Sequence, residues 1–124
     1  MNRNYMVFLK SDGLKFLAYP TSLSLNMTVR VMESKDELLA AQGRSCILMY
    51  TGERCPPCNA FKPRFVQLAK QFSHVEFYLL FMNSVAFRAS GRICSLPTFR
   101  RYEGGKLLGE VNGPDEAGVV GLLS

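Results

Sequence analysis

A Cys-x-x-Cys motif, Cys55-Pro56-Pro57-Cys58, separates two segments of contrasting pattern. Residues 46–50 before it are an unbroken apolar run, which is typical of a strand buried on both faces of a sheet. Residues 55–72 carry an apolar stripe with helical spacing, and this stripe predicts an amphipathic helix. Its members are Phe61, Phe65, Leu68, Ala69 and Phe72. The two cysteines are therefore expected where a buried strand leads into a helix.

This position has a chemical consequence for Cys55. The free N–H groups and the positive dipole end of a helix N-terminus stabilise a thiolate, which is the nucleophile in thiol–disulfide exchange. We therefore predict that Cys55 is the reactive thiol and that Cys58, one turn later and more buried, reacts second. Pro56 and Pro57 are compatible with the first helical positions, which need no N–H partner, and they stiffen the turn.

Structural thiols and a zinc site are the alternative interpretations of the cysteines. A zinc site from all four would need two close pairs, and Cys46 and Cys94 are isolated in the sequence. We therefore predict no metal site. Cys46 lies in the apolar run and is expected to be a buried, small hydrophobic residue. Cys94 is expected to be an ordinary loop cysteine, with oxidation or glutathionylation as the alternative.

From residue 28 onward the chain reads as alternating strands and helices. Ser34 and Glu37 form a capping box that opens a helix, and Gly43 ends it. Residues 103–106 are a tight hairpin turn between two strands. The other expected strands and helices are strands at 29–32, 75–82, 98–102 and 107–112, and helices at 34–42, 84–90 and from Asp115 onward. This order predicts an α/β fold with a mixed central β-sheet flanked by helices on both faces.

Composition excludes several classes of protein. A chain of 124 residues with 48% hydrophobic and 20% charged residues fits one globular domain. It has no apolar run of about 18 residues, so we predict no membrane association. The net charge of +5 is scattered rather than gathered in a basic tract, so we predict no nucleic-acid partner. Four cysteines are few for a disulfide-scaffolded secreted domain, and a reducing compartment fits better.

Residues 1–26 differ from the rest and form an N-terminal extension to the domain at residues 27–124. Three interpretations stay open. The extension is a basic targeting segment, a β-hairpin of residues 5–10 and 14–19, or a segment that precedes the natural initiator Met27. The charged residues of the extension are Arg3, Lys10, Asp12 and Lys15.

Residues 27–124 resemble the thioredoxin family. Cys55-Pro56-Pro57-Cys58 matches the position of the active-site motif, and its C-P-P-C form is similar to that of the tryparedoxins. Leu96-Pro97-Thr98 matches the segment in which a cis-proline faces the active-site cysteines. The remaining matches are Lys62-Pro63 in the active-site helix, the hairpin Tyr102-Glu103-Gly104-Gly105-Lys106, and Asn112-Gly113. The resemblance implies a thioredoxin fold.

The resemblance also implies a thiol-disulfide oxidoreductase that reduces or exchanges protein disulfides. Cys55 would attack the partner disulfide, and Cys58 would resolve the mixed disulfide. Leu96 would pair its backbone with the partner chain, and Pro97 would hold that surface open. The partners would be protein disulfides and an upstream dithiol reductant or reductase. The protein would act without a cofactor, as a monomer, in the cytoplasm, or in mitochondria if residues 1–26 are a targeting segment.

Three departures from the family pattern lead to an alternative function. Met49 stands where the family has a buried aspartate six residues before the first cysteine, and that aspartate helps to deprotonate the second cysteine. Arg54 replaces a tryptophan; its charge favours a thiolate at Cys55, but a flat contact surface is lost. Leu80-Phe81-Met82 replaces an aspartate-rich strand end. Low turnover is therefore expected, and the alternative is a redox-weak, thioredoxin-like protein-interaction domain.

Overall fold

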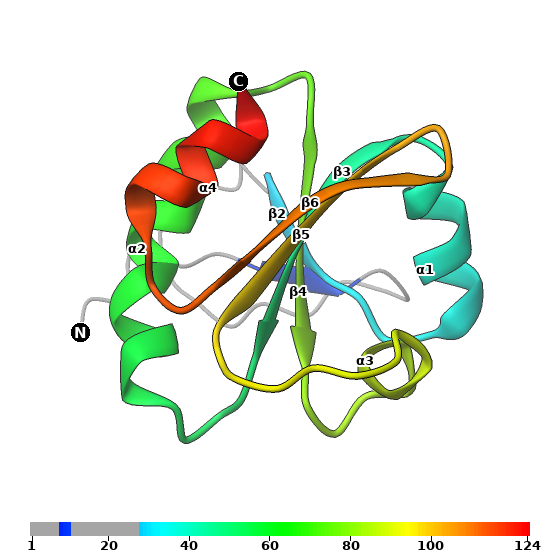
Figure 1. The fold of residues 1–124 in the computed structure, drawn as a ribbon. Coiled ribbons are helices and arrows are strands. Elements are labelled where there is room, and N and C mark those ends of the chain that lie inside the picture. Colours follow the sequence, from blue (N-terminus) through cyan, green and yellow to red (C-terminus); the bar gives the residue numbers. More distant parts are fainter. Residues whose placement is uncertain (1–7, 11–27) are drawn as a thin grey trace.

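The apolar run before the cysteine motif becomes an interior strand of a mixed sheet (Figure 1). The structure is a computed structural model that describes residues 8–10 and 28–124. Its strands are β1 (Phe8–Lys10), β2 (Val29–Val31), β3 (Ser45–Thr51), β4 (Glu76–Phe81), β5 (Thr98–Glu103) and β6 (Lys106–Asn112). Its helices are α1 (Lys35–Gln42), α2 (Pro56–Gln71), α3 (Val85–Ala89) and α4 (Glu116–Leu123). From residue 28 onward these bounds lie within two residues of the predicted ones, and the predicted order of elements is confirmed.

The described strands form one sheet in the order β1-β2-β4-β3-β5-β6. The pairs β1–β2, β2–β4 and β4–β3 are parallel, whereas β5 runs antiparallel to both β3 and β6. Each parallel connection from β2 onward passes through a helix, as crossover connections require, and the antiparallel pair β5–β6 needs only a short hairpin. The sheet is therefore mixed, as the sequence predicted.

Side chains of β3 alternate between two apolar cores because successive residues of a strand point to opposite faces. Ile47 and Met49 belong to the core under α2 and α4, which also contains Phe65 and Val119. Residues on the other face belong to the core under α1 and α3; they are Cys46, Leu48 and Tyr50. All five of these β3 side chains have an exposed fraction of 0%. Burial on both faces explains why this strand reads as a continuous apolar run.

The predicted capping box of α1 is present. The Ser34 hydroxyl accepts a hydrogen bond from the Glu37 N–H at 3.1 Å, and the Glu37 carboxylate accepts one from the Ser34 N–H at 3.0 Å. Gly43 ends the helix at the predicted position, but with a φ of −77° rather than in the left-handed conformation that usually favours glycine there. Its N–H instead bonds to the carbonyls of Leu39 and Ala40, so the helix closes in a right-handed turn.

Part of the N-terminal extension is a strand. Residues 8–10 fall inside the first strand of the hairpin considered above, and the partner that they have in the sheet is β2. The second strand of that hairpin, residues 14–19, lies outside the described residues. Among the described residues no helix is long and apolar enough to cross a membrane.

The capping box gives a test of the local fold. Ser34→Ala should lower the free energy of unfolding by about 1 kcal/mol, because the Glu37 N–H loses its acceptor. Urea unfolding followed by circular dichroism measures this, and Ser34→Asp serves as the control because a carboxylate also caps. Equal stability of the alanine and wild-type chains would contradict the assigned role of Ser34.

Candidate functional site

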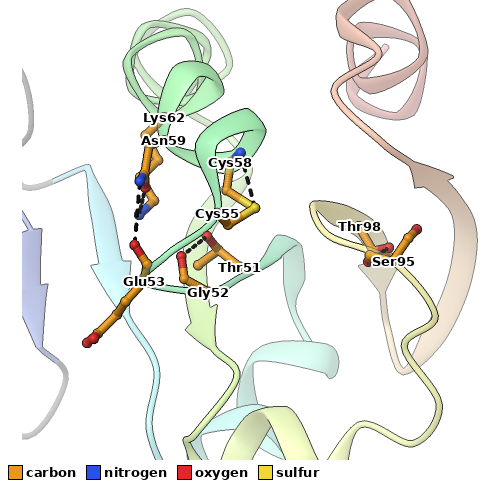
Figure 2. The surroundings of a disulfide bond; sticks show 9 residues. All are labelled: Thr51, Gly52, Glu53, Cys55, Cys58, Asn59, Lys62, Ser95 and Thr98. Atoms are coloured by element: carbon orange, nitrogen blue, oxygen red, sulfur yellow. Dashed lines mark hydrogen bonds between the residues drawn. A yellow bond between two sulfur atoms is a disulfide. The ribbon is translucent and has the colours of Figure 1, made fainter.

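The two motif cysteines lie where β3 leads into α2, as predicted, and they form a disulfide (Figure 2). Cys55 is the N-cap residue of α2, and Pro56 and Pro57 occupy its first two positions. The Cα atoms of Cys55 and Cys58 are 5.2 Å apart. Since the two prolines have no N–H, the first helical donor that reaches Cys55 is the Cys58 N–H, at 3.3 Å from Sγ. The Cys55 sulfur thus takes the place of the usual capping oxygen.

The two cysteines differ in their access to solvent. Cys58 has an exposed fraction of 0%, whereas Cys55 retains 8% and is preceded and followed by the exposed residues Arg54 and Pro56. Cys55 is therefore the more accessible of the two sulfurs.

The segment that leads into β5 borders the disulfide. The Leu96–Pro97 peptide bond is cis, as predicted. Three segments approach one another around Gly52. A Cβ built on Gly52 would lie 3.3 Å from Leu96 Cδ1, 3.6 Å from Met82 Sδ and 3.9 Å from Cys55 Cβ. Leu96 also packs against the core that contains Cys55 and Cys58. Pro97 is buried, and its carbonyl accepts a hydrogen bond from the Gly113 N–H at 2.7 Å. Sequence positions 52–58, 82 and 96 are thus brought together.

The surroundings of Cys58 are apolar. Met49 is completely buried in the same core as both cysteines, in the place where the resemblance expected an aspartate. The buried polar or charged side chains among the described residues are Thr51, Lys62, Thr98 and Arg101, so none of them is a carboxylate. In the reduced state, therefore, no buried carboxylate among the described residues could accept the proton of the Cys58 thiol.

Lys62 is a feature of the site that the sequence reasoning missed. Its exposed fraction is 6%, and its ammonium lies 4.9 Å from the centre of the Phe81 ring. The ammonium donates a hydrogen bond to Asn59 Oδ1 at 3.0 Å, and Figure 2 shows both side chains beside the loop that carries Glu53. Burial lowers the pKa of Lys62, while the charge of Glu53 acts in the opposite direction. The signal was its helical spacing, four residues after Cys58 and three before Phe65.

The other two cysteines take no part in this arrangement. Cys46 is buried in the core on the opposite face of the sheet from Cys58, and burial raises the pKa of its thiol to about 12. Cys94 is free and exposed. The predicted burial of Cys46 is confirmed, and Cys94 lies on a loop as expected. The four cysteines do not converge on one point. The described residues contain no group of three or more histidine, cysteine or acidic side chains arranged to hold a metal ion.

Comparisons with known proteins agree with this geometry. The thioredoxin family model matches residues 27–122. A thioredoxin of the sponge Geodia cydonium is 33% identical over 87 residues, which cover 68% of this chain and 82% of the relative. Mouse thioredoxin is 30% identical over 93 residues, covering 71% and 89% of the two chains. The structure of Trypanosoma brucei brucei thioredoxin superposes with a TM-score of 0.73 at 21% identity, over 84% of this chain and 95% of that one, which supports the fold.

The buried cation gives a pH-dependent prediction. Lys62→Met should raise the free energy of unfolding at pH 7, because methionine fills similar space without a charge to desolvate. The folded chain releases the Lys62 proton at a lower pH than the unfolded chain, whose lysine has the usual pKa of 10.5. The free energy of unfolding of the wild type therefore increases as pH rises toward 10.5. The amount by which the wild type is less stable than Lys62→Met, here called the stability deficit, should shrink over the same range.

Urea unfolding of both chains at pH 7 and pH 10 measures the deficit. Lys70→Met, an exposed position on the same helix, is the matched control and should show no such change. A deficit of the same size at both pH values would contradict the proposed desolvation of Lys62.

Proposed function

Because this chain belongs to the thioredoxin family, we propose that it is a thiol-disulfide oxidoreductase that reduces or exchanges protein disulfides. The observation that carries this proposal is the Cys55–Cys58 disulfide at the N-terminus of α2. A helix N-terminus favours the thiolate form, and a dithiol that closes into a disulfide without moving its backbone far can give up two electrons. The partners are protein disulfides and an upstream dithiol reductant or reductase.

The exchange proceeds in two steps that start from the reduced dithiol. The Cys55 thiolate attacks one sulfur of the partner disulfide, forms a mixed disulfide and releases the first partner thiolate, which takes up a proton. Cys58 then loses its proton, attacks Cys55 Sγ and releases the second partner thiolate. The partner has gained two electrons and two protons, and the chain is left in the disulfide form described above. The upstream dithiol returns the electrons.

We propose that the partner binds to a contact surface around Cys55. The residues of this surface are Arg54, Pro56, Pro57, Leu96 and Pro97. Pro56 and Pro57 are exposed on the first turn of α2, and Arg54 supplies a cation beside the nucleophile. Leu96 offers its backbone to an extended partner segment, in the manner of an added strand. The surroundings of Gly52 support this role, since a Cβ on that residue would lie within 4 Å of both the Leu96 side chain and Cys55 Cβ.

A redox-weak interaction domain is the second candidate function, and Met49 is the observation that favours it. Attack by Cys55 needs no buried base, but resolution by Cys58 requires a thiolate in an apolar core, where burial disfavours the charged form. We propose slow resolution and therefore long-lived capture of partners.

A cytoplasmic location is proposed, with mitochondria as the alternative if residues 1–26 are a targeting segment. One of the matched relatives is the mitochondrial thioredoxin O1 of Arabidopsis thaliana.

Insulin reduction tests the function directly. With dithiothreitol as electron source, the wild-type chain should accelerate precipitation of the insulin B chain, and Cys55→Ser should abolish the acceleration. Cys58→Ser should accumulate a mixed disulfide with insulin that mass spectrometry detects. A wild-type chain that forms the mixed disulfide without turnover would favour the interaction domain, and one that forms none would contradict both.

Met49→Asp tests the cause of slow resolution. A carboxylate at this position can accept the Cys58 proton, so the second step should become about tenfold faster or more, while attack by Cys55 stays unchanged. Stopped-flow traces against a model disulfide separate the two steps. Met49→Leu is the matched control, because it keeps an apolar side chain of similar size. Equal resolution rates in all three chains would mean that water or another group already serves as the base.

A further inference from the structure

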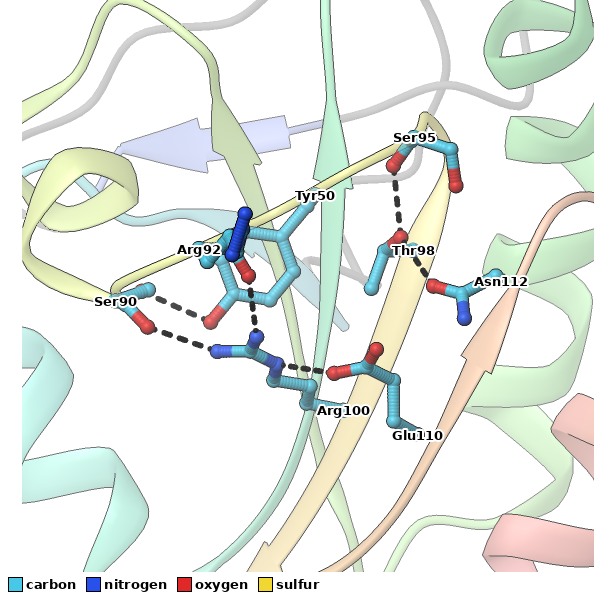
Figure 3. A network of polar contacts seen from close by, with 8 residues as sticks. All are labelled: Tyr50, Ser90, Arg92, Ser95, Thr98, Arg100, Glu110 and Asn112. Carbon is cyan, nitrogen blue, oxygen red and sulfur yellow. Dashed lines mark hydrogen bonds and ion pairs between the residues drawn. The ribbon is translucent and has the colours of Figure 1, made fainter.

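Arg100 sits at the centre of a polar network beneath the loop that carries Leu96 (Figure 3). Its side chain has an exposed fraction of 12%. Nη1 donates to the Ser90 carbonyl and Nη2 to the Arg92 carbonyl, both at 2.9 Å. Nε donates to the Glu110 carboxylate on β6 at 2.7 Å. All three nitrogens of the guanidinium are therefore engaged within the chain.

The same guanidinium lies on an aromatic ring that belongs to the core beneath the loop. Its carbon is 5.4 Å from the centre of the Tyr50 ring, and the Tyr50 hydroxyl donates to Ser90 Oγ at 2.9 Å. Burial raises the pKa of Tyr50 to about 12, so the hydroxyl keeps its proton at neutral pH. Ile93 and Leu96 pack against the core that contains Tyr50.

The loop of residues 91–97 has no regular secondary structure, so its backbone needs other partners. At the beginning of the loop, the Arg100 guanidinium donates hydrogen bonds to the carbonyls of Ser90 and Arg92. Thr98 supplies one near its end, where the hydroxyl donates to the Ser95 carbonyl at 2.7 Å. Leu96 follows directly on this second attachment.

We infer that Arg100 is a positioning residue that fixes the 91–97 loop, and with it the Leu96 backbone, for pairing with a polypeptide substrate. This inference rests on the proposed function. Arg100 is assigned no contact with substrate, since each of its three guanidinium nitrogens already donates to the Ser90 or Arg92 carbonyl or to Glu110. The planar fork of an arginine can serve three fixed acceptors at once, whereas a lysine presents a single flexible ammonium. Loss of the fork should therefore affect capture of a peptide and spare the chemistry at Cys55.

Two disulfides of different size separate these effects. Insulin needs backbone pairing beside Leu96, whereas the small disulfide 5,5′-dithiobis(2-nitrobenzoic acid) needs only access to Cys55. For Arg100→Lys and Arg100→Met we expect KM for insulin to rise about tenfold, because hydrogen bonds from a charged donor to the loop are lost. We expect kcat for insulin to stay within about twofold of wild type. The rate with the small disulfide should stay within about twofold of wild type.

Arg44 provides the matched control. It also forms a forked ion pair, with Nε and Nη2 on the Glu76 carboxylate at 2.9 and 3.0 Å, but its side chain is half exposed. Arg44 precedes β3, at the end of that strand opposite the disulfide. Arg44→Lys and Arg44→Met should leave both substrates unaffected. Glu110→Gln removes the charge partner on β6 but keeps the two loop carbonyls bonded, so it should also leave KM for insulin unchanged.

An unchanged KM for insulin in Arg100→Lys would overturn the inference, and so would an equal loss with both disulfides, because that pattern indicates a general disturbance of the fold. If Arg100→Met fails to fold, the lysine variant decides. A wild-type chain that reduces neither disulfide would contradict the proposed function itself, and the inference would fall with it. An active wild type with unaffected Arg100 variants would refute the inference alone.

Discussion

The rest of the structure depends on the burial of β3 on both faces. This strand pairs with β4 on one side and β5 on the other, and its side chains enter both apolar cores. Because it is held on four sides, the residues that follow it leave the sheet at a fixed point. That point is where Gly52 comes close to Leu96 and where Cys55 caps α2. The position of the disulfide is thus a consequence of how the central strand is packed.

Charge at the site is arranged without a buried carboxylate in the described part of the chain. Met49 stands where the family resemblance expects an aspartate, and Leu80-Phe81-Met82 stands where it expects an aspartate-rich strand end. The cation of Lys62 lies on the Phe81 ring of that segment. A site with these apolar residues and a lysine favours anions, such as the thiolates of the proposed exchange. It also leaves protons near Cys58 without an obvious acceptor. In the proposed reaction these two effects act on different steps, so turnover and capture would respond to them separately.

Local patterns in the sequence predicted most of the fold and the position of the motif. The capping box at Ser34, the apolar run of β3 and the hairpin turn depend on neighbouring residues, so they can be read directly. The cis peptide before Pro97 followed from the family resemblance. The burial of Lys62 had a local signal in its helical spacing, but its contact with the Phe81 ring depends on the packing of another element. The network of Arg100 could not be read locally, because its partners lie on other elements of the fold. Arg100, for example, reaches Glu110 across a strand pair and the loop carbonyls of residues 90 and 92.

The separation of the two cores by the sheet also prevents the formation of a wrong disulfide that involves Cys46. Cys46 and Cys58 lie behind opposite faces of the sheet, so a closed backbone stands between their sulfurs. The Cys46 thiol, in the core under α1 and α3, cannot reach the disulfide in the core under α2 and α4 unless the sheet opens. Burial also keeps the Cys46 thiol protonated. Intramolecular scrambling to a Cys46 disulfide is therefore blocked by geometry and by chemistry. The chain can therefore carry Cys46 in the buried strand β3 without a risk that it pairs with Cys55 or Cys58.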